Sequence, residues 1–352
     1  MKRKTTRHSR SAEVTKASMQ KWFEKRARRG TLSPAHNLAH VESVGIHAGV
    51  LAEEMARKSG ASKDSAKRTR RIAEATGTVH DIVRRATERT PHGVRGATTI
   101  KRMATLYPRV FGEFTPREID ILADATKAHE LSFRELTKAI RGFSPRKKIV
   151  ARSVHMADKL FEASGYRVLE RRAFFVGKER LKGDLKYLKR LYGANAPLYA
   201  VAMESCMRLR ARNVLGDYPK AIQPIARSLH VVQEKFYFGL LKQLGLTETR
   251  LIQEMERIKF PKFDRYNARI KSEVAKAASD RKVASTSKAV ARDAAELVLQ
   301  FNKAGSADTV LSKWKPKGKQ AREWLQGMKS ARVGGTEYLA RLQRQIRRAL
   351  TR

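Results

Sequence analysis

Apolar residues recur at spacings of three and four along most of this 352-residue chain, while short stretches that alternate apolar and polar residues are hard to find. Such spacing places the apolar side chains on one face of an α-helix. No internal repeat is visible. The sequence therefore predicts an all-α protein whose helices pack against one another through these faces.

Several helix starts are marked in the sequence. Ser or Thr directly before Pro suits the N-cap and the first helical position, as in Ser33-Pro34, Thr115-Pro116 and Ser144-Pro145. Glu118 completes a capping box with Thr115. These signals predict helices near 34–58, 116–131 and 145–163. A fourth helix is predicted from about Lys63 to Arg85, with His80 and Asp81 close to its end and an apolar face formed by Ile72, Ala75, Val79 and Ile82.

Composition suggests three parts, namely a basic segment 1–19, a helical domain 20–260 and a basic helical extension 261–352. After about residue 260 the chain becomes rich in Ala, Lys and Ser, so we expect the extension to supply little hydrophobic core. Its last segment keeps Leu339, Leu342 and Ile346 on one face against a nearly continuous Arg face. This pattern predicts a short basic amphipathic helix.

The single cysteine, Cys206, excludes an intrachain disulfide, and the expected location is the reducing cytoplasm. The basic N-terminus lacks the apolar core of a signal peptide, with an organelle transit peptide as the alternative. No run of about eighteen apolar residues is present, so we expect no membrane span.

The formal net charge is +42, from 76 Lys and Arg against 34 Asp and Glu. The basic residues are spread over the whole chain rather than confined to one tail. This distribution predicts a polyanionic partner, namely RNA, and a large RNA particle such as the ribosome in particular. The alternative is a highly soluble, solvated surface.

The adjacent residues His80 and Asp81 lie in a segment that otherwise reads as buried core, between Val79 and Ile82. A buried carboxylate without a partner costs several kcal/mol, so we expect Asp81 to be paired or bound to a metal. Imidazole and carboxylate ligands together suit a divalent ion such as Mn, Fe, Zn, Ni or Mg.

The surroundings of this doublet resemble the HD superfamily of metal-dependent phosphohydrolases at four separated places, in the right order. The resemblance covers about residues 20 to 180 and implies an HD-domain helical bundle. It is carried by the stretches AHNLAHVESVGIHAGVLAEE, TVHDIV, ILADATKAHELSF and ARSVHMADKLFEASGYRVLERRAFF.

By this resemblance, the divalent metal ion is held by His40, His80, Asp81 and Asp158. The alternative is that His40 and His129 are ordinary core histidines and that Asp158 pairs with an arginine. Asp81, or a nearby carboxylate, would also act in catalysis by taking a proton. His129 would act with it, because it occupies the position that faces the substrate phosphate or a second metal.

Three cations close to the ligands, Arg84, Arg85 and Lys159, are expected to contact the phosphate of a phosphate-ester substrate. Surface charges bound to RNA or solvent are the alternative. We also assign His92 to the substrate phosphate, although it could match the extra histidine of family members with two metals or lie in an ordinary loop. The residues after the doublet, Val83 to Arg85, depart from the family pattern and leave the substrate open.

Two functions follow from different features of the sequence. The ligand set favours a phosphohydrolase of nucleotide or nucleic-acid phosphate esters with a basic, RNA-binding surface. The net charge favours an RNA-associated structural or assembly protein, for example on the ribosome, that is built on an HD fold and has little or no catalytic activity.

Overall fold

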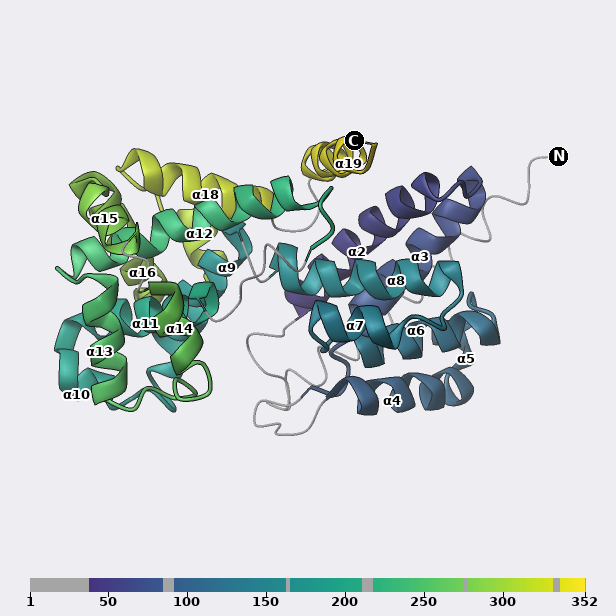
Figure 1. Cartoon of the computed structure of the whole chain (residues 1–352), viewed down its shortest axis with the longest axis horizontal. Helices are drawn as coiled ribbons and strands as arrows, with labels where there is room; N and C mark the ends of the chain where they lie inside the picture. The colour runs from purple at the N-terminus through teal and green to yellow at the C-terminus, as the bar shows by residue number, and fades with distance from the viewer. Residues whose placement is uncertain are drawn as a thin grey trace. The chain divides into compact units, whose positions relative to one another are not determined.

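A computed structural model describes residues 38–84, 92–162, 165–210, 218–274, 278–331 and 336–351. Every regular element in these ranges is a helix, which confirms the predicted all-α fold (Figure 1). None of these helices is both long and apolar enough to cross a bilayer. The predicted N-terminal segment 1–19 lies outside the described residues.

The chain forms two compact units. The first comprises Met1–Ala163, Asp217–Ile225 and Arg332–Arg352, and the second comprises Ser164–Gly216 and Ala226–Ala331. The boundary expected near residue 260 lies within the second unit.

The first unit contains the helices that carry the sequence motifs. They are α2 (Leu38–Lys58), α3 (Lys63–Val79), α4 (His92–Leu106), α5 (Pro108–Phe111), α6 (Pro116–Ala128), α7 (Phe133–Ala139), α8 (Pro145–Met156), the π-helix η2 (Ala157–Glu162) and α19 (Thr336–Thr351).

The predicted helix starts are largely observed. Thr115 and Glu118 form the expected reciprocal capping box at the start of α6. Pro145 begins α8, although Ser144 makes no side-chain hydrogen bond to cap it. The Ser33-Pro34 signal lies outside the described residues. His80 is the C-terminal cap of α3, so the helix ends at Val79 and the doublet follows it, whereas a helix that continues to about Arg85 was expected.

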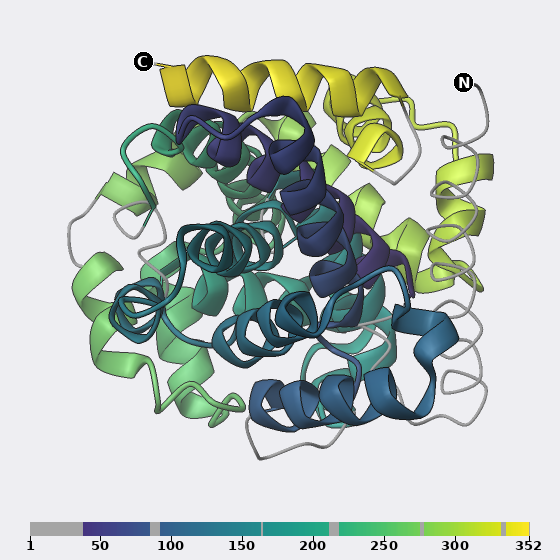
Figure 2. The same ribbon diagram turned by 90° about the vertical axis from the view of Figure 1, so that its right-hand side faces the viewer.

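Helix α19 packs against α2 at the edge of the first unit (Figure 2). Leu342 and Ile346 are buried, as the amphipathic pattern predicted. The guanidinium of Arg347 donates two hydrogen bonds of 3.0 Å to the carboxylate of Glu54 on α2. The basic C-terminal helix is therefore held both by apolar contacts and by an ion pair.

The second unit is built from α9 (Gly165–Arg171), the π-helix η3 (Arg172–Arg180), α10 (Leu188–Tyr192), the 3-10 helix η4 (Gly193–Asn195), α11 (Ala196–Arg210), most of α12 (Gln223–Gln243), α13 (Glu248–Arg257), α14 (Asn267–Val274), α15 (Ala278–Ser285), α16 (Lys288–Lys303), α17 (Ala307–Lys313) and α18 (Lys319–Ala331).

The expectation that the extension supplies little core is wrong. Phe263, Leu297, Phe301 and Trp324 are buried in the core of the second unit, and the Trp324 ring packs edge-on against Phe236 with 5.5 Å between ring centroids. The Ala-rich composition of α16 conceals this contribution, because its larger apolar residues occupy only one face while its Lys and Arg residues occupy the other.

Candidate metal centre

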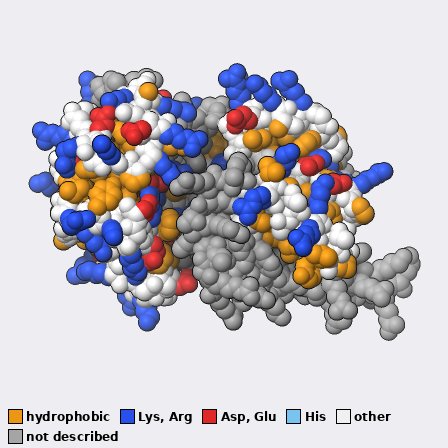
Figure 3. All heavy atoms as spheres, turned by 90° about the horizontal axis from the view of Figure 1, so that it is seen from below, with side chains coloured by type: hydrophobic (Ala, Val, Ile, Leu, Met, Phe, Trp, Pro, Cys, Tyr) orange, Lys and Arg blue, Asp and Glu red, His pale blue; other side chains and the backbone are white. Residues whose placement is uncertain are grey.

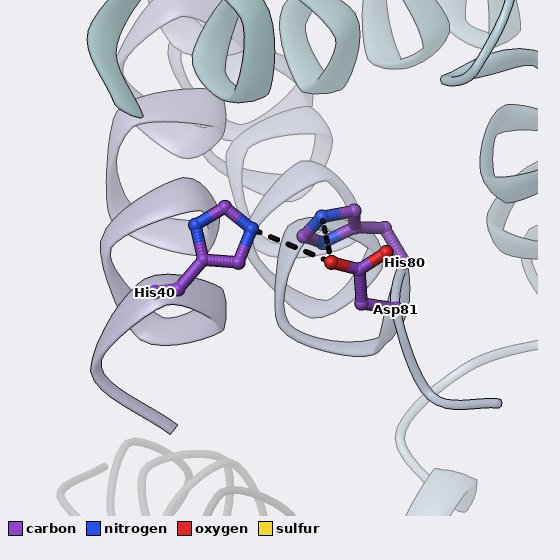
Figure 4. Close-up of side chains that lie close together, drawn as sticks. All are labelled: His40, His80 and Asp81. Carbon is purple, nitrogen blue, oxygen red and sulfur yellow. Dashed lines mark ion pairs between the residues drawn. The ribbon is translucent and has the colours of Figure 1, made fainter. Parts of the chain in front are cut away.

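The structure brings together four residues that lie far apart in the sequence. His40 lies at the start of α2, His80 and Asp81 follow α3, and Asp158 lies in η2, directly after α8. Both imidazoles point toward the carboxylate of Asp81 (Figure 4). A π-helical turn is uncommon and is often found at a functional site, and here it carries Asp158.

One oxygen of the Asp81 carboxylate faces the first pair of histidines. Oδ2 lies 3.4 Å from His40 Nε2 and 3.3 Å from His80 Nε2. Asp158 approaches the same two imidazoles, with its Oδ1 3.6 Å from His40 Nε2 and 4.0 Å from His80 Nε2. Two imidazole nitrogens and two carboxylates thus surround one point.

The other oxygen of Asp81 faces a second pair of histidines. Oδ1 lies 2.7 Å from His92 Nε2 and 3.8 Å from His129 Nε2. The two Nε2 atoms are themselves only 3.1 Å apart. Two imidazole lone pairs at this distance repel unless they share a proton or a cation. The Asp81 carboxylate therefore lies between two sets of histidines.

Backbone carbonyl groups fix the orientation of two of these imidazoles. His80 Nδ1 lies 2.6 Å from the carbonyl oxygen of Gly77, and His129 Nδ1 lies 2.5 Å from that of Thr126. A carbonyl oxygen only accepts hydrogen bonds, so each Nδ1 carries the proton. In the neutral imidazole each Nε2 then turns its lone pair toward the carboxylates, which is the arrangement of metal-binding histidines.

The carboxylate of Glu130 fixes the orientation of the His92 imidazole. Its Nδ1 donates to Glu130 Oε1 at 2.6 Å, while the backbone N–H of Gly93 donates to Oε2 of the same carboxylate at 2.6 Å. Burial raises the pKa of Glu130, but these hydrogen bonds outweigh it and lower the pKa to about 2. Glu130 is therefore ionised at neutral pH and orients the His92 ring.

Burial and charge set the protonation of the cluster. Burial alone lowers the pKa of His80, but the neighbouring Asp81 outweighs it and the pKa is raised above its usual value. Burial raises the pKa of Asp158, yet Lys159 and the nearby histidines hold it well below its ordinary range. For His129, burial dominates and lowers the pKa. Asp158 is thus ionised, and Lys159 and the nearby histidines help to balance its buried negative charge.

These separations suit a divalent ion. An ion about 2.0–2.2 Å from each of several nitrogen and oxygen ligands leaves the ligands about 3.0–3.5 Å from one another. Each of three groups in the described ranges has its ligand atoms within 4.8 Å of one another: His40, His80 and Asp81; His80, His129 and Asp158; and Asp81, His92 and His129. These buried His and Asp side chains could hold a metal ion.

Two of the expected phosphate-binding cations touch the candidate ligands. The guanidinium of Arg84 lies 3.4 Å from Asp81 Oδ1 and 3.2 Å from His92 Nε2. Lys159 Nζ lies 2.8 Å from Asp158 Oδ2. Both side chains are partly exposed, so they can also meet a bound molecule. Arg85 lies outside the described residues.

Two residues near the centre were not identified from the sequence. Glu130 follows His129 directly, and His155 lies one turn before Asp158. His155 Nδ1 lies 3.2 Å from the carbonyl oxygen of His129. Burial lowers the pKa of His155 to about 4, so its imidazole is neutral. In the sequence, the only indication that such supporting residues lie near the centre was that Glu130 directly follows His129.

No known protein family, curated protein or solved structure matches the chain. The described residues form a helical protein with a buried His and Asp cluster that could hold a metal ion. This arrangement is compatible with an HD domain.

Proposed function

We propose that the chain is an HD-type metal-dependent phosphohydrolase that acts on nucleotide or nucleic-acid phosphate esters. One observation carries the proposal: the two oxygens of the Asp81 carboxylate face two separate sets of imidazole Nε2 atoms. The order of the four sequence motifs supports the same family.

The residues divide into two ligand sets. His40, His80, Asp158 and Oδ2 of Asp81 would hold one divalent ion, while His92, His129 and Oδ1 of Asp81 would hold a second. Such ions, when bound, polarise a phosphoryl oxygen and lower the pKa of water. His92 thus joins the proposed ligands rather than the groups that contact only the substrate.

The remaining polar groups have separate tasks. Arg84 and Lys159 are partly exposed cations beside the ligands, so they can orient the substrate phosphate and stabilise the negative charge that develops on it. Glu130 keeps the His92 ring in one orientation. The carbonyl oxygens of Gly77 and Thr126 do the same for His80 and His129, which preserves the site before substrate binds.

Hydrolysis of bis(p-nitrophenyl) phosphate and of a nucleotide panel, after chelation and addition of Mn²⁺, tests the proposal. Asp81→Ala should lower kcat/KM by more than the roughly 10- to 100-fold that is typical of groups that only support a ligand. Asp120→Ala is the matched control, because Asp120 is an exposed carboxylate that pairs with Lys101 away from the cluster. No metal-dependent hydrolysis by the unmodified chain would oppose the proposal.

The basic exterior favours a second candidate function, namely the binding of a large RNA such as that of the ribosome. The outer face of α19 shows why, since Arg341, Arg344 and Arg348 are exposed at spacings of three and four. If the chain is mainly an RNA-associated structural or assembly protein, Asp81→Ala should leave RNA affinity unchanged and hydrolysis should be absent from the unmodified chain.

A further inference from the structure

The inner face of α4 is tightly fixed against α6. A methyl group at Gly93 would lie 2.9 Å from the carbonyl oxygens of both Thr126 and Lys127, and one at Gly96 would lie 2.9 Å from the Thr126 side chain. Glycine at these two positions lets the helices approach closely. The inner face of the helix is therefore closely packed against α6, and its outer face points away from this contact.

The outer face of α4 combines apolar and basic side chains. It is formed by Val94, Arg95, Thr98, Lys101, Arg102, Thr105 and Leu106, all exposed, and exposed Tyr107 follows. Five large hydrophobic residues are exposed in the described ranges, and three belong to this segment: Val94 (50%), Leu106 (55%) and Tyr107 (56%). Leu106 and Tyr107 adjoin at the C-terminal end of α4, and adjoining exposed apolar side chains can mark a binding surface.

The charge of this face selects the class of partner. Helix α4 contains no acidic residue, and Arg102 is exposed on its outer face. Lys101 forms an ion pair with Asp120. In the view from below, Lys and Arg side chains lie among apolar ones over the first unit (Figure 3). A face of this kind complements a molecule that carries negative charge and flat apolar surface together.

The position of α4 connects this face to the candidate metal centre. The helix begins at His92, whose Nε2 lies 2.7 Å from Asp81 Oδ1, and it ends next to Tyr107. A chain molecule lying along the outer face therefore has one end beside the cluster. Arg84, which contacts both Asp81 and His92, stands at the same end.

We infer that the outer face of α4 binds a single-stranded nucleic acid and directs one of its phosphates to the metal centre. Bases of a single strand are free to stack on Tyr107 and to contact Leu106, while Arg102 neutralises a phosphate. A duplex hides the faces of its bases and presents its phosphates, its sugars and the base edges in its grooves. The inference rests on the proposed phosphohydrolase and names its substrate class.

Fluorescence anisotropy with a labelled single-stranded RNA of about a dozen uridines, set against a duplex of equal length, tests the inference. Arg102→Gln with Tyr107→Ala should weaken binding of the single strand about 5- to 100-fold and duplex binding much less. The matched control is Arg190→Gln with Leu191→Ala, a neighbouring basic and exposed apolar pair on α10 in the second unit. Leu106→Ser is a second variant that should weaken the single strand in the same direction.

Hydrolysis separates this inference from the proposed function. The α4 variants should raise KM for the oligonucleotide while leaving hydrolysis of bis(p-nitrophenyl) phosphate unchanged. If the unmodified chain hydrolyses neither substrate, the proposed function fails. The anisotropy measurement still tests whether the outer face of α4 binds a single strand. Equal weakening by the α4 and α10 variants would overturn the inference. The inference would also be overturned if the α4 variants changed self-association, measured by light scattering, but left the affinity for the single strand unaltered.

Discussion

A methyl group added to Gly77 would lie 2.6 Å from the Cα of Gly45, so α2 and α3 cross with their backbones almost in contact. Along α2 this crossing follows His40 by five residues, and along α3 it precedes His80 by three. It brings the two imidazoles close enough for both Nε2 atoms to face Asp81. The close approach of the two backbones therefore supports the geometry of the candidate centre.

Gly77→Ala should separate the two helices and weaken metal binding. Forcing a methyl group into a packed contact typically costs about 1–3 kcal/mol, and here the neighbouring atoms are backbone and cannot rotate away. Thermal unfolding and calorimetric titration with Mn²⁺ measure the two effects. Gly142→Ala is the matched control, since a methyl group there meets nothing within 4 Å. Unchanged Mn²⁺ affinity in Gly77→Ala would show that the crossing does not position the ligands.

Much of the fold could be predicted from the sequence. The periodicity predicted the all-α fold, and the Thr115 and Glu118 pattern predicted a capping box that is present. The role of Gly77 could not be predicted, because a helical glycine is informative only when the neighbouring helix is known. The core of the second unit could not be predicted for the same reason, because Trp324 packs against Phe236 of a helix that is distant in the sequence.

Arg347→Gln should loosen α19 from α2. The guanidinium donates two hydrogen bonds to the buried carboxylate of Glu54, so the substitution leaves that charge with fewer donors. Trypsin cleavage within α19 should accelerate at least about fivefold, a modest factor because Arg347 is half-exposed. Arg344→Gln is the control, because it also removes one exposed trypsin site. Equal rates in the two variants would contradict a holding role for the pair.

Low pH should loosen α19 in the same way. Burial raises the pKa of Glu54, but the hydrogen bonds from Arg347 and Gln343, together with the positive charges of Arg347 and Arg57, outweigh it and the pKa is lowered. A carboxylate with a lowered folded-state pKa stabilises the fold above its unfolded pKa of about 4.3, and this contribution is lost as pH falls through the lowered value. Trypsin does not work there, so pepsin cleavage or hydrogen exchange of α19 between about pH 5 and pH 2 is the measurement. Glu54→Gln should remove this pH dependence.

Metal affinity should decrease as the pH is lowered, starting at a pH above the usual histidine pKa. In the metal-free protein, burial lowers the pKa of His80 but Asp81 raises it further, so the folded state holds this proton more tightly than the unfolded state. That contribution to stability is present below the unfolded pKa of about 6.5 and is lost as pH rises through the raised value. An ion must displace the proton, so Mn²⁺ affinity should drop up to about tenfold per pH unit below the raised pKa. Titrations between pH 5.5 and 8.5 that show constant affinity would contradict this.

RNA affinity should depend steeply on salt. With six or more phosphate contacts, binding weakens about a thousandfold or more between about 50 and 200 mM salt. Replacing Arg341, Arg344 and Arg348 by Gln should lower the slope of log affinity against log salt by about 2, since each contact to a single strand contributes about 0.7. Substitutions are used here because deletion of residues 261–352 would remove Phe263, Phe301 and Trp324 from the core. A slope near zero in the unmodified chain would leave RNA binding without support.

The candidate centre was only partly predictable. The resemblance at four motifs assigned His40, His80, Asp81 and Asp158 to one ion, and the structure brings them together. Their roles as ligands stay predictions. The part played by Glu130 could not be inferred, because its contact with His92 joins two helices whose relative placement the sequence does not state.

Metal analysis of purified, RNA-free protein tests the central claim most directly. We predict one divalent ion in each ligand set after equilibration with Mn²⁺ and desalting, measured by plasma mass spectrometry against protein concentration. His92→Ala should lose the second ion alone, because His40, His80 and Asp158 belong only to the first set. Asp81→Ala should lose both, because its carboxylate faces both sets. Unmodified protein that retains no divalent ion, while folded by circular dichroism, would contradict the account.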